Sequence, residues 1–411
     1  MKKRSVFFSF CRDALGSVTQ GGVRYHLWMA CLTFLMLVGT YAYSIQLKTG
    51  LVVTGMTDYV SWGLYISNFT FLVGIAAAAV MLVLPAYIFK DVDFSRAVLI
   101  GEGTAVAALI MCLSFVVVDL GGPARMWHLI PGIGLFNWPQ SMLAWDVIVL
   151  NGYLFLNLTI PSYILYRHYQ GKQPVKKVYI PAVFLSVFWA VGIHLVTAFL
   201  YAGLPARAFW NSSLLGPRFL ASAFAAGPAL IIIILGLIRK YMDFDIESVT
   251  IQKIALIATV AAQINMIMLG SEIFKEFYAP TEHSLSALYL FFGLEGHTSL
   301  VPWIWTGILL NLAATIALTV HAFRKRERLL YLACAALFIG IWIEKGMGLI
   351  VPGFIPSPWG QIVEYSPTWI EIGVTVGIWA LGAFVFTMLV KIAIPIERGT
   401  LRLKGIEQTH E

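Results

Sequence analysis

The chain has 411 residues, of which 59% are hydrophobic and only 12% are charged, with a formal net charge of +7. Because a soluble domain averages about 25% charged residues, this composition excludes an ordinary soluble globular protein. Runs such as ALIIIILGLI do not alternate between apolar and polar residues, which favours membrane helices over membrane strands. The predicted fold class is therefore an all-α polytopic membrane protein.

Taken in chain order, residues 1–24 begin with MKKR and are predicted to be a cytoplasmic segment. About ten apolar runs follow, each close to the roughly 20 residues that a helix needs to cross a bilayer. The predicted spans are 25–46, 59–88, 95–119, 143–166, 178–201, 217–238, 252–275, 301–323, 328–351 and 368–393.

Lys and Arg residues are distributed unevenly between the connections. If the N-terminus is cytoplasmic, 22 of the 28 Lys and Arg residues fall on the cytoplasmic side and the other 6 on the outer side. Cytoplasmic loops of membrane proteins carry such an excess, so both termini are predicted to be cytoplasmic, in the cytoplasmic (inner) membrane. The same rule explains the basic balance, so no nucleic-acid partner is implied.

Two pairs of spans resemble each other. SNFTFLVGIAAAAVMLVLP in the second span resembles ASAFAAGPALIIIILGLI in the sixth, and the fourth and eighth spans open similarly. A shift of four spans keeps the orientation, so we predict a parallel repeat of two four-helix bundles with two flanking helices. The predicted units are a first flanking helix with its loop (25–58), two bundles (59–216 and 217–367) and a last flanking helix with a cytoplasmic tail (368–411).

The positions of the cysteines and histidines indicate which cofactors this chain could bind. The four cysteines, Cys11, Cys31, Cys112 and Cys334, form no C-x-x-C motif, so the sequence predicts neither a metal site nor an iron–sulfur cluster in this chain. A di-haem site needs facing histidines on neighbouring spans, and only His194 lies well inside a span. Haem is therefore not expected, although these positions leave a single haem open.

Two similar stretches carry charged and aromatic residues at the ends of spans: DLGGPARMWHLIPG (119–132) and YAGLPARAFW (201–210). Ionisable residues inside a membrane are costly and usually mark a site or a pathway. Most lie near the predicted outer side, and Glu102 alone lies on the inner half. The candidates for proton transfer are Asp119, Glu102, His194, Glu272 and Glu344.

Four long stretches resemble a known family. They are WGLYISNFTFLVGIAAAAVMLVLPAYIFKD (62–91), VVVDLGGPARMWHLIPGIGLFNWPQSMLAWDVIVLNGYLFLN (116–157), HLVTAFLYAGLPARAFWNSSLLGPRFLASAFAAGPAL (194–230) and LVKIAIPIE (389–397). Together they resemble the NrfD/PsrC family of quinone-interacting membrane subunits, in particular its ten-span DsrP/HmcC branch. One departure is that other branches have a histidine in the second span, as GIAHAG, where this chain has GIAAAAV.

The resemblance implies a subunit that exchanges electrons between menaquinol or menaquinone and an outer-side ferredoxin-like iron–sulfur subunit. A multihaem cytochrome c is often part of such a complex. The loops at 120–142 and 202–216 are the expected docking surface. An ion- or proton-translocating subunit, or a secondary transporter without quinone chemistry, is the alternative that the buried acids leave open.

Within that resemblance, Trp62, Tyr65 and Asn68 are spaced to share one face of the second span and are expected to bind the quinone. His128 and Asp146 are expected to join them, because both can exchange protons. The alternative roles are interfacial anchoring for Trp62 and Tyr65, helix packing for Asn68 and a solvated loop position for His128. Asp119 and Asp146 could instead form a structural clasp at the loop between their spans, with Arg125 bound to either one. Arg125, Trp127, Arg207 and Trp210 are expected to be structural or docking residues.

Overall fold

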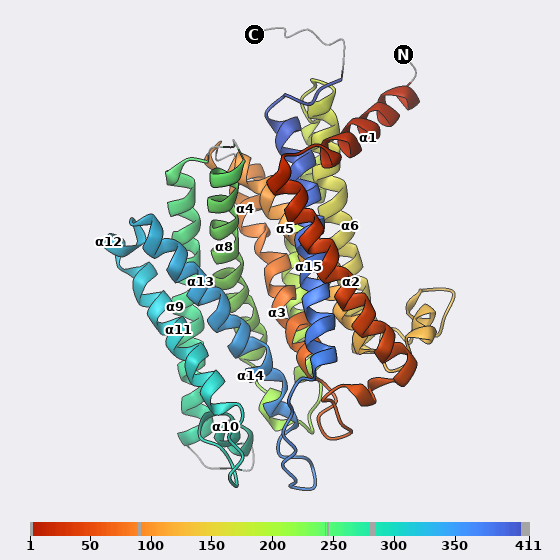
Figure 1. Cartoon of the computed structure of the whole chain (residues 1–411). Coiled ribbons are helices and arrows are strands. Elements are labelled where there is room, and N and C mark those ends of the chain that lie inside the picture. Colours follow the sequence, from red (N-terminus) through yellow and green to blue (C-terminus); the bar gives the residue numbers. More distant parts are fainter. Residues whose placement is uncertain are drawn as a thin grey trace.

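The structure is a computed structural model that describes residues 3–88, 92–242, 244, 246–278, 281 and 284–403. Within these residues it has helices and no β-strand, and a single isolated bridge joins Leu294 and His297. Ten of the described helices are long and apolar enough to cross a membrane. The prediction of an all-α polytopic membrane protein is confirmed (Figure 1).

The spans agree with the predicted runs to within a few residues at most ends. The first five are α2 (Val23–Thr49), α3 (Leu64–Ala78) with α4 (Val80–Val83) and η2 (Leu84–Ile88), α5 (Val92–Asp119), α6 (Met142–Tyr169) and α7 (Lys176–Ala202). The next five are α8 (Leu215–Tyr241), α9 (Ser248–Tyr278), α11 (Val301–Thr319), α13 (Glu327–Lys345) with α14 (Met347–Ile350) and η5 (Pro352–Phe354), and α15 (Trp369–Glu397). Short helices outside the spans are α1 (Lys3–Thr19), η1 (Leu51–Val53), η3 (Pro123–Leu129), η4 (Ala208–Trp210), α10 (Ser284–Phe291) and α12 (His321–Arg324).

Local sequence explains several helix ends. Ser141 caps α6 by accepting a hydrogen bond from the amide of Ala144 at 3.3 Å. Thr368 and Glu371 form a capping box at the start of α15. The second span changes to a π-helical turn at η2, which contains Pro85, because proline has no N–H to donate within the helix.

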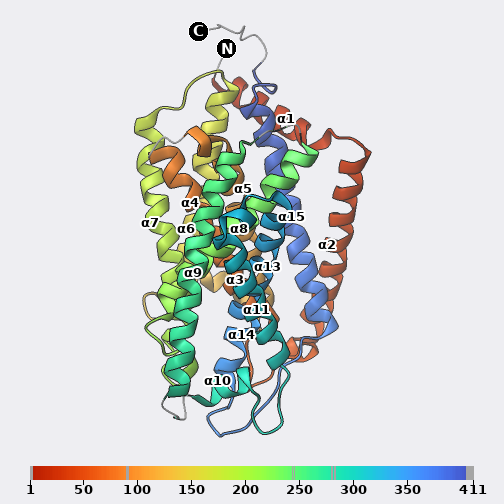
Figure 2. The same cartoon turned by 90° about the vertical axis from the view of Figure 1, so that its left-hand side faces the viewer.

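The helices pack in pairs around a central contact. α3 packs on α5, α6 on α7, α8 on α9 and α11 on α13, while α3 also packs directly on α8. α2 and α15 form a separate pair that lies against α5 through α15, and Figure 2 shows α2 at one edge of the molecule and α7 at the other. The internal repeat remains a prediction, but the contact between α3 and α8 places the second and sixth spans at the centre.

An even number of spans places α1 and the end of α15 at the same end of the molecule (Figure 1). We call this end the termini side. The opposite end, which carries η1, η3, α10 and the segment 355–368, is the loop side. α1 packs on the termini side through Phe10, whose ring makes edge contacts with Tyr166 and Tyr169 of α6.

Candidate functional site at the loop-side ends of the helices

Asp146 lies one turn inside the loop-side end of α6 and is almost fully buried, with 1% of its surface exposed. Its Oδ1 accepts a hydrogen bond of 3.1 Å from the hydroxyl of Thr197 on α7. Its Oδ2 is buried and has no hydrogen-bond partner in the described part of the chain. A carboxyl group with a free oxygen is able to accept or donate a proton, which makes Asp146 a strong candidate for proton chemistry.

One face of α7 adjoins Asp146. His194, Thr197 and Tyr201 are spaced three and four residues apart, so they lie on the same side of the helix. The hydroxyl of Tyr201 forms a hydrogen bond with Thr70 of α3. We call Asp146, Thr197, Tyr201 and Thr70 the Asp146 cluster.

His194 is the titratable residue beside this cluster, and it is fully buried. Its Nδ1 lies 2.9 Å from the carbonyl oxygen of Ala190, whereas its Nε2 has no partner among the described residues. A carbonyl can only accept, so this contact assigns the ring proton to Nδ1 and leaves Nε2 as an acceptor.

Aromatic rings surround Tyr201 on the loop side. Trp62 stacks on Trp210 with ring centroids 5.7 Å apart, and both rings contact Phe354 edge-on. Tyr201 contacts both indoles. The result is an apolar wall between η4, η5 and the residues that precede α3.

Two side chains of the 201–210 stretch hold this stretch, which includes η4, against the 349–354 segment. The Trp210 indole is fully buried and donates to the carbonyl of Leu349 at 2.9 Å. The Arg207 guanidinium lies 4.8 Å from the centre of the Phe354 ring, and burial lowers its pKa. These contacts give Trp210 and Arg207 a packing role in the structure.

The predicted second-span triad is not assembled as expected. Trp62 precedes α3, which begins at Leu64, so it does not share a helical face with the other two residues. The Tyr65 hydroxyl donates to Gln46 of α2 at 2.7 Å. The Asn68 side-chain oxygen accepts from the indoles of Trp342 and Trp379 at 3.1 and 2.9 Å. Helix packing therefore occupies the polar groups that were expected to face a quinone.

The 119–132 stretch leaves α5 at the loop side. Asp119 ends α5, and its Oδ1 is buried without a partner in the described structure. His128 stacks on Trp127 with centroids 3.8 Å apart, and its Nδ1 accepts from the amide of Leu135. Arg125 is exposed and forms no ion pair with Asp119, Asp146 or any other described residue.

A second buried cluster, which the sequence did not reveal, joins α8, α9, α11 and α13. The Arg218 guanidinium contacts Glu272 and lies 2.6 Å from Glu344. The other oxygen of Glu344 accepts from the side-chain amide of Asn311 at 2.7 Å. We call Arg218, Glu272, Glu344 and Asn311 the Arg218 cluster, and it brings together two of the predicted proton-transfer residues.

Lys345 is the next residue along α13, and only 6% of its surface is exposed. Its ammonium lies 3.4 Å from the centre of the Phe219 ring, and Phe219 also contacts Tyr201. The Asp146 and Arg218 clusters are therefore neighbours across the contact between α7 and α8. The sequence did contain a signal for Arg218. This residue follows LLGP at the predicted outer end of the sixth span, and a cation inside an apolar span usually has a buried partner.

Glu371, at the start of α15, ties three loop-side segments together. Its carboxylate accepts from the Tyr365 hydroxyl at 2.5 Å and from the amides of Gly55 and Thr368 at 2.7 and 2.9 Å. Burial and the neighbouring Glu371 charge raise the pKa of Tyr365, which keeps its hydroxyl protonated as a donor.

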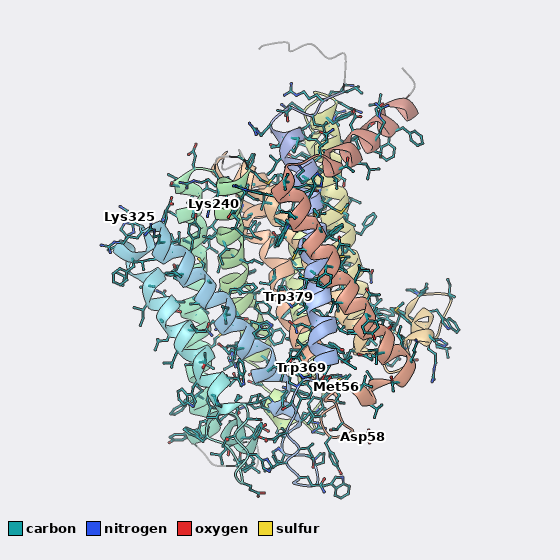
Figure 3. All side chains as sticks on the ribbon, in the orientation of Figure 1. Met56, Asp58, Lys240, Lys325, Trp369 and Trp379 are labelled. Atoms are coloured by element: carbon teal, nitrogen blue, oxygen red, sulfur yellow. The ribbon has the colours of Figure 1, made fainter. Side chains whose placement is uncertain are left out.

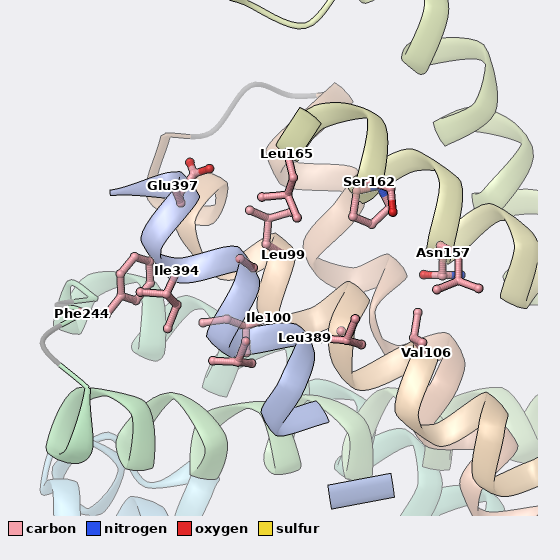
Figure 4. Close-up of a pocket in the computed structure, with 15 residues that line it drawn as sticks. Leu99, Ile100, Val106, Asn157, Ser162, Leu165, Phe244, Leu389, Ile394 and Glu397 are labelled. Atoms are coloured by element: carbon pink, nitrogen blue, oxygen red, sulfur yellow. The ribbon is translucent and has the colours of Figure 1, made fainter. Parts of the chain in front are cut away.

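Glu102 lies on the half of α5 nearer the termini side, is 2% exposed, and accepts from Tyr87 at 3.3 Å. On the same half, a groove with about 630 Å³ of empty space, including its open side, lies between α5, α6 and α15 (Figure 4). Its walls include Leu99, Leu389 and Glu397, but none of the residues predicted to bind a quinone.

Among the described residues, no group of three or more His, Cys, Asp and Glu side chains is arranged to hold a metal ion.

Known proteins resemble this chain along most of its length. Residues 52–355 match the family described as polysulphide reductase, NrfD. One of the selenate reductase subunits of Mesobacillus selenatarsenatis is 24% identical over 93% of this chain and 96% of its own length. The integral membrane subunit of an Hdr-like menaquinol oxidoreductase of Archaeoglobus fulgidus is 22% identical over 90% and 93%.

The menaquinone reductase integral membrane subunit of Nitratidesulfovibrio vulgaris is 27% identical over 89% of this chain and 90% of its own length. The family match covers well over half of the chain and includes the residues of the Asp146 cluster. With the ten membrane helices, it confirms the resemblance inferred from the four sequence stretches: the chain belongs to the polysulphide reductase NrfD family of membrane proteins.

Proposed function

We propose that the chain is the quinone-reactive membrane subunit of a multi-subunit respiratory oxidoreductase. In this role it exchanges electrons between menaquinol or menaquinone and an iron–sulfur subunit. Membership of the NrfD family supports this proposal, as do the functions named for two relatives, a menaquinone reductase and a menaquinol oxidoreductase. The observation that carries it is the buried Asp146 carboxyl with one free oxygen beside an aromatic wall.

Menaquinol supplies two electrons and two protons when it is bound. A site for it needs an apolar wall, a polar group that reaches the ring oxygens, and a proton acceptor. Trp62 and Trp210 provide the wall. Asp146 Oδ2 and His194 Nε2 are two of the buried polar atoms that have no partner among the described residues. Tyr65 and Asn68 are already hydrogen-bonded to other helices, so we assign them to positioning α3.

The remaining titratable residues suggest where protons leave. Asp119 and His128 lie on the loop side, and we propose that they relay protons from Asp146 to that side. Glu272 and Glu344 share Arg218, so proton transfer through them would require that ion pair to open. Glu102 is a buried acid on the half nearer the termini side and would serve a proton path towards that side.

The orientation follows from charge. We propose that the termini side faces the cytoplasm and that the partner subunits, a ferredoxin-like protein and a multihaem cytochrome c, assemble on the loop side. Met126, Trp127, Ile130, Ile133, Leu135 and Trp138 are exposed large side chains in the connection between α5 and α6. This connection is a better docking candidate than 202–216, whose Trp210 is buried within the chain.

Asp146→Asn in the assembled complex tests the proposal. The amide keeps the size of the side chain but cannot take up a proton, so we expect menaquinol oxidation to fall by about a hundredfold. The control is Thr159→Val on the same helix, because Thr159 is exposed and bonds only to carbonyls of its own helix. Binding of a quinone-site inhibitor and the integrity of the assembled complex are measured in parallel.

Unchanged turnover and inhibitor affinity in Asp146→Asn would overturn this site. A complex that moves protons but binds no quinone analogue would instead support the ion-translocating alternative. His128→Ala provides a further comparison, since loss of turnover with intact inhibitor binding would place His128 in proton relay.

A further inference from the structure

A basic pocket lies at the termini-side end of α9, next to α12. It has about 980 Å³ of empty space, including its open side. Among the described residues, its lining consists of Ser248, Val249, Gln252, Lys253, Leu256, His321, Arg324 and Lys325. Three of these carry a fixed positive charge, one is a histidine, and none is a carboxylate. Figure 3 shows Lys325 at this end of the helices.

The pocket is built by a break between α11 and α12. α11 ends at Thr319, Val320 is extended with φ −74° and ψ 107°, and α12 then begins at His321. The Arg324 guanidinium turns back to donate to the carbonyl of Leu318 in the last turn of α11 at 2.7 Å. The side chain of Gln252 on α9 donates to the carbonyl of Arg324 at 3.1 Å and holds α12 against α9.

The charges in the pocket are available to a ligand to different extents. His321 and Lys325 are exposed. The Arg324 Nε atom is buried and has no partner among the described residues. The ammonium of Lys253 lies 5.8 Å from the centre of the Phe94 ring and forms part of the pocket wall.

Apolar surface continues from the pocket towards the middle of the membrane. On α9, Leu256, Val260, Ile264 and Ile267 are 42–69% exposed and lie on one stripe of the helix. Leu309, Leu312 and Ile316 are likewise exposed on α11, which packs on α9. At 1.5 Å per residue the α9 stripe is about 16 Å long, close to half of a roughly 30 Å hydrocarbon layer.

We propose that this pocket binds the phosphate of an anionic phospholipid, whose acyl chains lie along the exposed stripes of α9 and α11. Basic pockets between membrane helices on the cytoplasmic side are suited to such headgroups, because the phosphate is attracted to the cations while the chains stay in hydrocarbon. A free phosphate or nucleotide would use the same cations but would have no use for the apolar stripes. The lipid is therefore the ligand that fits both features.

Lys325→Glu tests the proposal, with Lys177→Glu as the matched control. Lys177 is an exposed lysine at the start of α7 on the same side, outside the pocket. The complex, delipidated in neutral detergent, is titrated with phosphatidylglycerol, phosphatidylcholine or inorganic phosphate. Bound lipid is counted by native mass spectrometry, and the unfolding temperature without lipid confirms that both variants fold.

We expect phosphatidylglycerol to bind the wild type and the Lys177→Glu variant equally, and to bind Lys325→Glu at least about fivefold more weakly. Equal binding to all three proteins would overturn the site, and so would equal loss in the two variants. Equal binding of phosphatidylcholine would show that the negative charge of the lipid is not recognised. Displacement of the lipid by millimolar inorganic phosphate would show that the ligand is a free anion.

Discussion

The Arg218 guanidinium on α8 lies 2.6 Å from the Glu344 carboxylate on α13, and the same guanidinium contacts Glu272 on α9. One buried cation therefore joins three membrane helices. Charged groups in hydrocarbon are stable only when they are paired, so each helix requires the other two for its polar side chain. This relationship makes the Arg218 cluster a structural centre of the chain as well as a candidate for proton transfer.

Arg218→Met should destabilise the chain strongly, because it leaves two buried carboxylates without their cation. We expect a loss of about 3–5 kcal/mol, measured as unfolding in detergent. Arg239→Met is the control, since Arg239 pairs with Glu327 at 3.1 Å in an exposed position and should cost at most about 1 kcal/mol. Equal effects of the two substitutions would show that the Arg218 cluster adds no stability of its own.

Asn68→Leu should destabilise the contact of α3 with α13 and α15. The substitution leaves the indole N–H groups of Trp342 and Trp379 without an acceptor, at a cost of about 1–3 kcal/mol. Asn151→Leu is the matched control, because Asn151 is exposed and bonds only to Val147 of its own helix. If Asn68→Leu unfolds at the same temperature as Asn151→Leu, the two indole bonds are energetically unimportant.

Gly377→Leu should separate α2 from α15. A Cβ atom at Gly377 would lie 2.6 Å from the Cα of Gly39, so the backbones must move apart, at a cost of about 1–3 kcal/mol. The loss of packing between the two helices is measured as a lower unfolding temperature in detergent. Gly192→Leu, at a site with no atom within 4 Å of an added Cβ, should unfold at the temperature of the wild type.

The loop-side contact of Glu364 should depend on pH. Burial alone would raise the pKa of this carboxyl, but hydrogen bonds from Ser299 and His297 and the charge of His297 lower it below its ordinary value of 4.5. Because the pKa is lower in the folded state, the contact stabilises the loop above the ordinary value and is lost as the pH falls through the folded value.

Hydrogen exchange at the Ser299 amide, which donates to Glu364 at 3.1 Å, measures this loss. We expect protection at pH 6 and progressively less protection, after correction for intrinsic exchange, below pH 4.5. In Glu364→Gln the protection should not vary over this range. The same pH dependence in both proteins would assign it to another group.

The sequence by itself determined the membrane helices and the family. Span positions follow from runs of apolar residues and from breaks such as Gly-Gly-Pro after Asp119, because hydrocarbon tolerates only a backbone whose hydrogen bonds are satisfied within a helix. The acids Asp146, Glu272 and Glu344 were recognisable for the same reason, since an ionisable residue in an apolar run is conspicuous. Asp146 remains a candidate for proton exchange in the folded chain, because its Oδ2 is buried and has no partner among the described residues.

Only the tertiary structure decided which polar groups meet. Arg218 and Glu344 are 126 positions apart, and the two indoles that engage Asn68 come from α13 and α15. Helical periodicity fixes the face on which a side chain lies, but it does not specify which helix covers that face or at what depth. Those choices depend on close backbone contacts such as Gly39 with Gly377 and on buried polar groups finding partners, which are properties of the packed bundle. The sequence therefore predicts that Tyr65 and Asn68 bind a ligand, whereas in the folded chain their polar groups form hydrogen bonds with neighbouring helices.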